Sequence, residues 1–388
     1  MTQHTSQNKV YFPNLNGLRA IGAFTVLFSH FYFLKIMWGF QARQWFPIPG
    51  KVGVALFFAL SGFLITSLLF RELDKTSTIR LKDFYIRRIL RIWPLYYLIV
   101  LVGLLVFNRI PALKIPVLSD RMIQDMSWIN LINVLLIIPN FTHFYIPYTD
   151  QRWSIIVEEL FYFIQPMLVR TFRNKYVLIC CFCAIVFSSE LFAGLIRLLH
   201  LDRHVSANVT GAILGQLGYL GCIAVGCIFS ALYKKRESFC KKYLFSRWTQ
   251  IGILLLLLVC FYISYVQKNE LYFDLRWYSF LFAILVLNAA LNPATIYRLE
   301  HPVLNYLGKI SYGIYMYHMF CLGIAFVIAR ALTDNPWIQN PIYFVLSIGL
   351  TIGVSALSFK YLEAFFLGLK KHPIARSQPQ SGIAYRAK

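Results

Sequence analysis

Charged residues are scarce in this sequence, and acidic residues are the scarcest. Only 14% of its 388 residues are charged, and 16 Asp and Glu stand against 38 Lys and Arg, for a net charge of +22. Hydrophobic residues make up 58%, and the mean hydropathy is +0.59. A soluble domain of this size does not carry so much apolar surface, so we expect a polytopic membrane protein.

Several signals that would indicate other classes of protein are also missing. The polar first fifteen residues hold no apolar stretch followed by a small-residue cleavage site, so no removed signal peptide is expected. The eight cysteines fall mostly inside apolar segments without metal-ligand spacing, and we expect packing residues and no metal site. No repeat or long linker divides the chain. We expect a single membrane domain over residues 1–370 and a flexible cytoplasmic tail over 371–388.

Ten apolar segments are long enough to cross about 30 Å of hydrocarbon as helices. They lie near 16–36, 52–70, 92–108, 153–169, 176–196, 209–232, 250–266, 276–292, 310–330 and 341–360. The shorter segment 128–141 favours a re-entrant or interfacial helix. With both termini in the cytoplasm, most Lys and Arg lie on the inner side, as the positive-inside rule requires. The expected fold is therefore an all-α membrane bundle of about ten transmembrane helices in the cell inner membrane.

The excess of basic residues raises the question of a nucleic-acid partner. These residues are scattered over short loops between the expected spans, and no separate soluble region presents a groove. Attraction to anionic lipid headgroups explains them more simply, so we expect membrane lipid as a partner and no nucleic acid.

Two ionisable residues lie inside the first expected span. Arg19 and His30 are eleven positions apart in the sequence. On an α-helix this spacing places the two side chains within about 20° of the same face and about 16 Å apart along the axis. A charged group at a helix centre costs about 2.5 to 3.5 kcal/mol on insertion scales, so such groups mark a cavity or a reaction path. Imidazole can also accept and return a proton near neutral pH. We therefore expect His30 to take part in proton transfer.

Three arginines precede the third span. Arg87, Arg88 and Arg91 are three or four positions apart, so their guanidinium groups can converge on one anion such as a phosphate. A basic cytoplasmic loop required by topology alone is the competing interpretation. In the second span, Ser61 and Gly62 let another backbone approach closely. This segment is either part of the polar site or only a surface where two helices pack, and the sequence favours neither.

Polar residues also enter the fourth and ninth spans. In the fourth span Trp153 suits an interfacial anchor, Ser154 and Glu158 share a face, and Glu159 and Tyr162 are offset from it. Two adjacent carboxylates in a span favour chemistry or ion handling over a structural salt bridge.

The ninth span brings Ser311, Tyr315 and His318 to one face, where they can line a cavity. A lone histidine in a span is often only a hydrogen-bonded packing residue, so we rank His318 below His30 as a reacting group.

Six ordered motifs carry a resemblance to a known family. They are NLNGLRAIGAFTVLFSH, LFFALSGFLIT, RRILRIWPLYY, WSIIVEELFYF, ISYGIYMYH and FKYLEAFF, between about residues 11 and 366. Together they resemble the acyltransferase-3 family of membrane O-acyltransferases. Asn16, Leu160 and Tyr317 replace the usual Asp, Gln and Trp of the family, and the loss of the acid leaves open how Arg19 is held. The esterase-like domain that some members carry is not expected here.

The resemblance implies transfer of an acyl group, usually acetyl, from cytoplasmic acyl-coenzyme A to a hydroxyl of a surface or exported glycan or glycoside. The coenzyme phosphates would bind Arg87, Arg88 and Arg91, and the acyl arm would pass Arg19 toward His30. His30, oriented or charge-balanced by Glu158, would deprotonate the acceptor. A covalent route through Ser61, Ser154 or Ser311 is equally open.

A proton-coupled secondary transporter of a small polar solute is the alternative function. In that case Arg19, His30, Glu158 and Glu159 would carry protons or bind the solute. The absence of a detectable inverted repeat weighs against transport.

Overall fold

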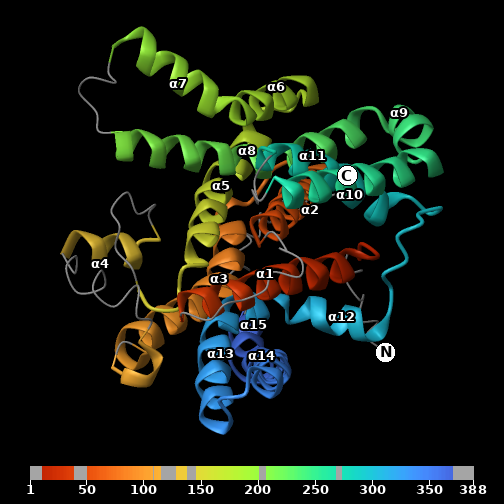
Figure 1. Ribbon diagram of the computed structural model, residues 1–388. Coiled ribbons are helices and arrows are strands. Elements are labelled where there is room, and N and C mark those ends of the chain that lie inside the picture. The colour runs from red at the N-terminus through yellow and green to blue at the C-terminus, as the bar shows by residue number, and fades with distance from the viewer. Residues whose placement is uncertain are drawn as a thin grey trace, which may run out of the picture.

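The computed structural model describes residues 11–38, 50–107, 109–114, 128–137, 146–200, 207–267 and 273–369. Every regular element in these ranges is a helix, which confirms the all-α prediction (Figure 1). The α-helices are α1 Leu15–Met37, α2 Gly50–Thr76, α3 Leu81–Val102, α4 Trp128–Leu135, α5 Arg152–Thr171, α6 Lys175–Val186, α7 Ser188–Leu198, α8 Ala207–Lys235, α9 Glu237–Phe239, α10 Arg247–Val266, α11 Leu275–Leu291, α12 Pro302–Lys309, α13 Ser311–Leu332, α14 Pro336–Ser358 and α15 Ala364–Leu369. Short π-helical turns occupy Gly103–Phe107, Cys240–Leu244 and Phe359–Glu363, and a 3₁₀ turn occupies Pro111–Leu113.

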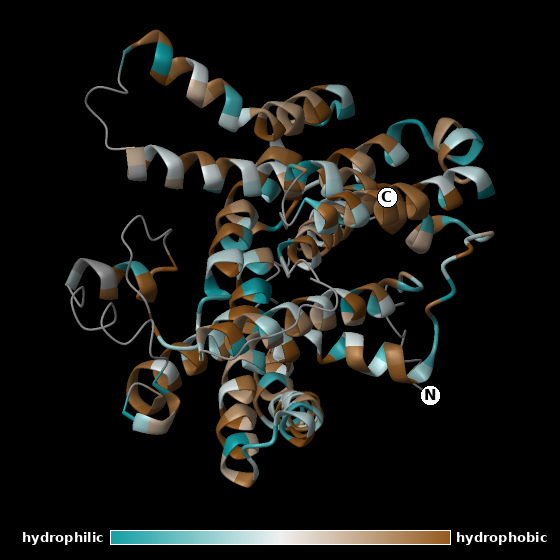
Figure 2. Ribbon diagram, in the orientation of Figure 1, coloured by the Kyte–Doolittle hydropathy of each residue, from teal (hydrophilic) through white to brown (hydrophobic). Residues whose placement is uncertain are grey.

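Within the described ranges, seven helices are long and apolar enough to cross a membrane, or eight if the bent pair α6 and α7 forms one span. Figure 2 shows apolar residues along most of the helices, with hydrophilic residues concentrated at helix ends and connections. Each of the ten predicted segments coincides with a helix or a helix pair. The count of ten crossings stays a prediction, since α11 is short and α5 is rich in polar residues. The predicted tail 371–388 lies outside the described residues.

The segment predicted as one span over 176–196 is instead bent by 59° between α6 and α7. Arg276, at the start of α11, donates to the carbonyl of Val186 at 2.9 Å and to Ser189 Oγ at 3.2 Å, and it forms an ion pair with Glu190. A bend frees backbone carbonyls from the helix, and these contacts satisfy one of them. The predicted short helix near 128–141 is present as α4, next to α3: Tyr96 donates to the carbonyl of Val134 at 3.1 Å.

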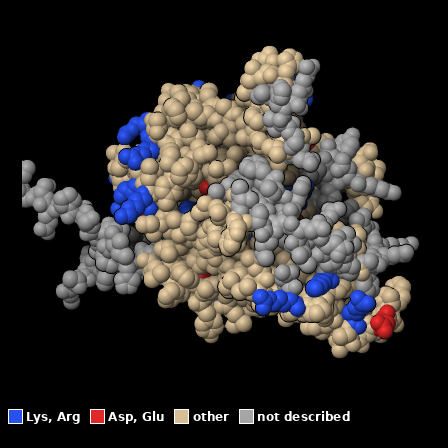
Figure 3. Space-filling model, turned by 90° about the vertical axis from the view of Figure 1, so that its left-hand side faces the viewer, with Lys and Arg blue, Asp and Glu red and all other residues tan. Residues whose placement is uncertain are grey.

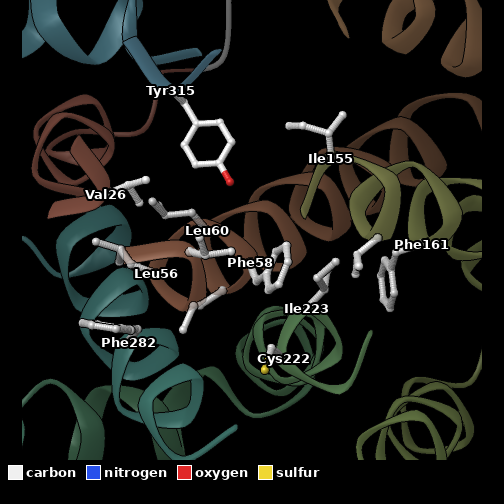
Figure 4. Packing of buried hydrophobic residues seen from close by; sticks show 14 of the residues in the cluster. Val26, Leu56, Phe58, Leu60, Ile155, Phe161, Cys222, Ile223, Phe282 and Tyr315 are labelled. Atoms are coloured by element: carbon white, nitrogen blue, oxygen red, sulfur yellow. The ribbon is translucent and has the colours of Figure 1, made fainter. Parts of the chain in front are cut away.

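Close helix crossings at small residues build the core. A Cβ on Gly62 of α2 would lie 2.0 Å from the carbonyl oxygen of Ile223 in α8, and one on Gly226 would lie 2.3 Å from that of Ala59. The predicted close backbone approach at Gly62 is therefore confirmed. Around this crossing, apolar side chains of several helices interdigitate, and the Tyr315 hydroxyl points toward them from α13 (Figure 4).

Local contacts also fix the beginning of α1. Asn14 has a left-handed backbone conformation (φ 60°), its side chain donates to the carbonyl of Ala289 at 3.0 Å, and its Oδ1 accepts from the backbone N–H of Leu299 at 2.7 Å. Asparagine tolerates this conformation better than most residues. Glu300 accepts from Tyr11 Oη and from the backbone N–H of Asn14. These contacts hold the turn of α1 that carries Arg19.

Charge is sparse on the outer surface. The face in Figure 3 shows Lys and Arg in small separate groups among broad uncharged areas. Several basic groups near the ends of α2, α6 and α8 lie over aromatic rings, such as Lys175 over Phe70 at 4.3 Å and Lys235 over Tyr176 at 5.0 Å. These cations are thus held near apolar surface, as is typical of residues at a membrane boundary.

Candidate active site

A cavity of about 150 Å³ lies among α1, α2, α3, α5 and α13. Phe57, Phe58, Leu64 and Ile155 supply part of its apolar wall. Its polar wall gathers most of the site residues predicted from the sequence, which are Arg19, Ser61, Arg88, Arg91, Ser154, Glu158, Tyr162, Ser311 and Tyr315. Segments that are far apart in the sequence therefore meet here as the motif analysis expected.

Glu158 is the carboxylate of this cavity. It accepts hydrogen bonds from Ser61 Oγ of α2 and from Tyr162 Oη, one turn further along α5, at 3.0 Å. Of the three predicted serines, only Ser61 points its hydroxyl at a carboxylate. Ser311 Oγ donates to the carbonyl of Gly308 at 2.9 Å, and Ser154 Oγ donates to that of Gln151 at 3.1 Å.

Three guanidinium groups share the cavity with Glu158. Arg19 of α1 and Arg88 and Arg91 of α3 interact electrostatically with one another and with Glu158. Among the described residues, none of the three has a carboxylate within salt-bridge distance. Two aromatic rings flank Arg88, those of Phe84 and Tyr162, and its buried Nε has no hydrogen-bond partner among the described residues. Guanidinium groups that form no direct ion pair in a cavity provide an anion-binding site.

Asn16, which stands where the family usually has Asp, holds Arg19 in place. Its Oδ1 accepts from Arg19 Nη1 at 3.2 Å, so an uncharged amide holds the guanidinium in place. A Cβ on Gly308 would lie 2.0 Å from the carbonyl oxygen of Asn16, which shows how tightly α12 packs against this turn of α1. An amide orients the arginine without neutralising its charge.

Of the three arginines predicted to converge, only Arg88 and Arg91 line the central cavity. Arg87 forms an ion pair with Glu72 of α2 at 3.3 Å and does not line the central cavity. Neighbouring residues on a helix point about 100° apart, so Arg87 faces α2 while Arg88 faces inward. Arg87 and Glu72 line a second cavity, which shares Ile65, Leu68 and Arg88 with the first. The two cavities thus adjoin along α2 and α3.

The two predicted histidines form a pair outside the central cavity. His30 Nδ1 lies 3.2 Å from His318 Nε2, and the ring centroids are 4.9 Å apart. Tyr315 lies between the pair and the cavity: its Oη is 2.5 Å from Ser154 Oγ, while its carbonyl lies 2.7 Å from His318 Nδ1. The carboxylate of Asp150 acts electrostatically on both His30 and Tyr315.

The expected orientation of His30 by Glu158 is not observed. Glu158 is already engaged by Ser61 and Tyr162, and His318 is the side chain next to His30. Ser154, Glu158 and Tyr162 follow at intervals of four and form one polar ridge along α5, about 6 Å per step, and Asp150 lies just before this helix. Asp150 is the acid whose charge acts on His30.

Two further predicted residues lie outside the cavity wall. Trp153 packs against Tyr219 of α8, with centroids 4.5 Å apart, as a packing residue would. Glu159 accepts from Trp93 Nε1 at 3.0 Å, and its buried Oε1 has no partner among the described atoms.

Three residues near the site, Tyr312, Glu363 and Asp150, were not predicted as site residues from the sequence. Tyr312 lines the cavity and donates to the carbonyl of Ile92 at 2.8 Å. Glu363 is buried and acts electrostatically with Arg91. An acid in the apolar motif FKYLEAFF was the signal for Glu363, but only the fold brings it to Arg91. In the part of the chain that the structure describes, no cluster of three His, Cys, Asp or Glu could hold a metal ion.

Comparison with known proteins agrees with the motifs. A family model described as an acyltransferase domain matches residues 12–360. The chain is 27% identical over 373 residues to a candidate O-acetyltransferase of Staphylococcus aureus strain COL, covering 92% of this chain and 57% of that protein. It is also 27% identical over 391 residues to the O-acetyltransferase OatA of strain MRSA252, covering 95% and 60%.

The chain thus spans somewhat more than half the length of these relatives. No solved structure matches. The family match covers nearly all of the described helices, and the resemblance inferred from the six motifs is confirmed. The chain is an integral membrane protein of the acyltransferase-3 family.

Proposed function

We propose that this protein is a membrane O-acetyltransferase that moves an acetyl group from acetyl-coenzyme A to a hydroxyl of an extracytoplasmic or exported glycan or glycoside. The observation that carries the proposal is a cavity in which Arg19, Arg88 and Arg91 form no ion pair with any described carboxylate, and which Tyr315 separates from a histidine pair. The family and the names of the relatives support this reaction class.

The donor would bind at the arginines. Coenzyme A carries a 3′-phosphate and a diphosphate, and guanidinium groups pair with phosphate oxygens in bidentate geometry. Arg88 borders both adjoining cavities, so phosphates bound there could leave the acyl arm directed into the central one. The Arg87–Glu72 ion pair would lie beside the entrance. Other acyl-coenzyme A donors share this binding chemistry.

The transfer would follow from a base next to the acceptor. His30 takes the proton of the acceptor hydroxyl, the oxygen attacks the thioester carbonyl carbon, and the carbon–sulfur bond breaks to release coenzyme A, which recovers the proton. A low-water cavity favours transfer over hydrolysis. In the covalent alternative Ser61, whose hydroxyl donates to Glu158, would first carry the acetyl group.

The membrane arrangement belongs to the same proposal. The arginine end of the cavity would face the cytoplasm together with both termini, and the histidine pair would face the acceptor side of the inner membrane. The basic groups at the ends of α2, α6 and α8 would contact anionic lipid. No nucleic-acid partner is proposed.

The direct test uses purified protein in lipid vesicles with acetyl-labelled coenzyme A and a panel of glycan acceptors. Label should appear on an acceptor, with loss of thioester in equal amount. A proton-coupled transporter, the alternative, would move a solute across the vesicle wall without consuming thioester. Solute uptake with intact thioester would therefore overturn the proposal. Comparing surface glycans of a deletion strain with its parent, by the mass of one acetyl group, would identify the acceptor.

A further inference from the structure

Two backbone carbonyls fix the proton positions of the histidine pair. His318 Nδ1 lies 2.7 Å from the carbonyl of Tyr315, and His30 Nδ1 lies 3.0 Å from that of Val26. A carbonyl oxygen only accepts hydrogen bonds, so both Nδ1 atoms must carry hydrogen. In the neutral rings, both Nε2 atoms are then bare.

The contact between the rings agrees with this assignment. His318 Nε2, bare in the neutral ring, lies 3.2 Å from His30 Nδ1, which carries the hydrogen. The hydrogen of His30 is thus shared between the Val26 carbonyl and the His318 lone pair. In the opposite tautomer of His30, the Nδ1 atom would carry a lone pair in place of hydrogen. That lone pair would face the carbonyl oxygen of Val26 and the Nε2 lone pair of His318, and both contacts would be repulsive.

We propose that His318 is a positioning residue that holds His30 in the Nδ1–H tautomer and so leaves Nε2 of His30 as the atom that accepts the acceptor's proton. This inference rests on the proposed function of His30 as the base. His318 is buried and lies outside the arginine cavity, so it acts through His30 rather than on the coenzyme.

Contacts with neighbouring residues fix the position of the His318 ring. Its Nδ1 is bound to the carbonyl of Tyr315 in the preceding turn of its own helix, and Tyr315 in turn lies against Ser154 of α5. The pair is therefore tied to the same α5 ridge that carries Glu158. The groups that act on His30 from neighbouring elements are His318 of α13 and Asp150 before α5. A neutral base flanked by one carboxylate is suited to hold a transferred proton.

Three variants separate positioning from packing. His318→Gln keeps an amide acceptor near the place of Nε2, whereas His318→Asn keeps only a donor near Nδ1, and His318→Phe keeps ring bulk alone. We expect His318→Asn and His318→Phe to lower kcat for acetyl transfer roughly 10- to 100-fold, as when the second partner of a ligating histidine is lost. KM for acetyl-coenzyme A should change by less than about twofold, and His318→Gln should recover most of kcat.

The decisive measurement reads the tautomer itself, by ¹⁵N NMR of histidine-labelled protein in bilayers. The chain has eight histidines, so the His30 signal is assigned by its loss in His30→Gln. The parent should show a protonated Nδ1 and a bare Nε2 at His30, and His318→Asn should raise the share of the other tautomer, because only the Val26 carbonyl then opposes it. A parent signal with protonated Nε2, or equal loss of kcat in His318→Gln and His318→Asn, would overturn the inference. A parent that shows the expected tautomer but transfers no acetyl group would instead count against the proposed function alone.

Discussion

At the scale of single residues, the arginines differ in what already occupies them. Arg87 is paired with Glu72, while Arg88 and Arg91 face the cavity without a carboxylate partner. Arg19 is held by the neutral Asn16 and keeps its full charge for a ligand. Neighbouring arginines of the same helix therefore have different roles: Arg87 forms an ion pair, and we assign anion binding to Arg88 and Arg91, which face the cavity.

The arginine variants test this division. Arg88→Ala and Arg91→Ala should each weaken coenzyme A binding roughly 10- to 100-fold, because each removes a charge-assisted hydrogen bond worth about 1.5 to 3 kcal/mol. Arg87→Ala removes the same charge but should weaken binding less than about threefold. Calorimetric titration of detergent-solubilised protein with coenzyme A measures all three. Equal losses in the three variants would show that net charge, not the cavity, binds the coenzyme.

At the scale of helices, close approach at glycine decides the geometry of the bundle. The α2–α8 crossing lets Ser61 reach Glu158 of α5, because α2 lies directly against its neighbours along this stretch. A side chain inserted there has no space, since the obstacle is the backbone of α8 and not a flexible side chain. The crossing thus belongs to the support of the site as well as to the core.

Substitution at this crossing should destabilise the bundle. Gly62→Ala places a Cβ against the Ile223 carbonyl, so we expect a loss of about 1 to 3 kcal/mol in the free energy of unfolding, typical of overpacking. The matched control is Gly252→Ala in α10, where a Cβ meets nothing within 4 Å and helix propensity improves. Denaturant titration in detergent micelles measures both. A Gly62→Ala protein as stable as Gly252→Ala would contradict the close crossing.

The contact before α1 should depend on pH. Burial raises the pKa of Glu300, but hydrogen bonds from Tyr11 and the Asn14 N–H outweigh this and lower it below its usual value. The same hydrogen bond to Glu300 raises the pKa of Tyr11 to about 12. A lowered carboxyl pKa stabilises the fold above the unfolded pKa, and this is lost as pH falls through the folded value. The raised tyrosine pKa stabilises below about 10 and is lost as pH rises toward 12.

We therefore expect the melting temperature of the parent to exceed that of Glu300→Gln near pH 7. The difference should shrink as pH falls below about 4, where the unfolded glutamate also takes its proton. Thermal denaturation of both proteins across this range measures the difference, and subtraction cancels the other acids. A difference that persists unchanged at pH 3 would contradict the ionised contact.

Helix positions could be predicted because the apolar period depends on local sequence, and the ordered motifs identified Arg19, Ser61, Arg88, Arg91 and Glu158 as candidate site residues. Side-chain partners could not be predicted. The direction of Arg87 and the pairing of His30 with His318 depend on how distant helices rotate against each other. The bend between α6 and α7 was hidden for a similar reason, since Arg276 comes from a later segment.

At the scale of the whole molecule, the polar groups form a column through an apolar bundle. The column runs from Glu72 and Arg87 through the central cavity and past Tyr315 to the histidine pair and Asp150. One end is basic and the other holds imidazoles beside a carboxylate. This asymmetry fits a donor that enters at one membrane face and an acceptor that arrives at the other.

This arrangement predicts the membrane side from which the donor and the acceptor each reach the site. In sealed vesicles with the protein in one known orientation, acetyl-coenzyme A should be consumed only when supplied on the side of Arg87. The acceptor should be modified only on the opposite side. Protease accessibility of the chain termini fixes the orientation independently. Consumption of coenzyme from the histidine side would contradict the assigned direction of the path.

The central claim is that the site is an acyltransferase with His30 as its base, and one comparison tests it most directly. Parent and His30→Ala proteins, equally abundant and equally able to bind coenzyme A, are assayed for transfer of labelled acetyl groups to the acceptor. We predict unchanged coenzyme affinity and a fall in transfer of about 10²- to 10⁴-fold, the usual contribution of general acid–base catalysis. Transfer by His30→Ala at the parental rate would contradict the account.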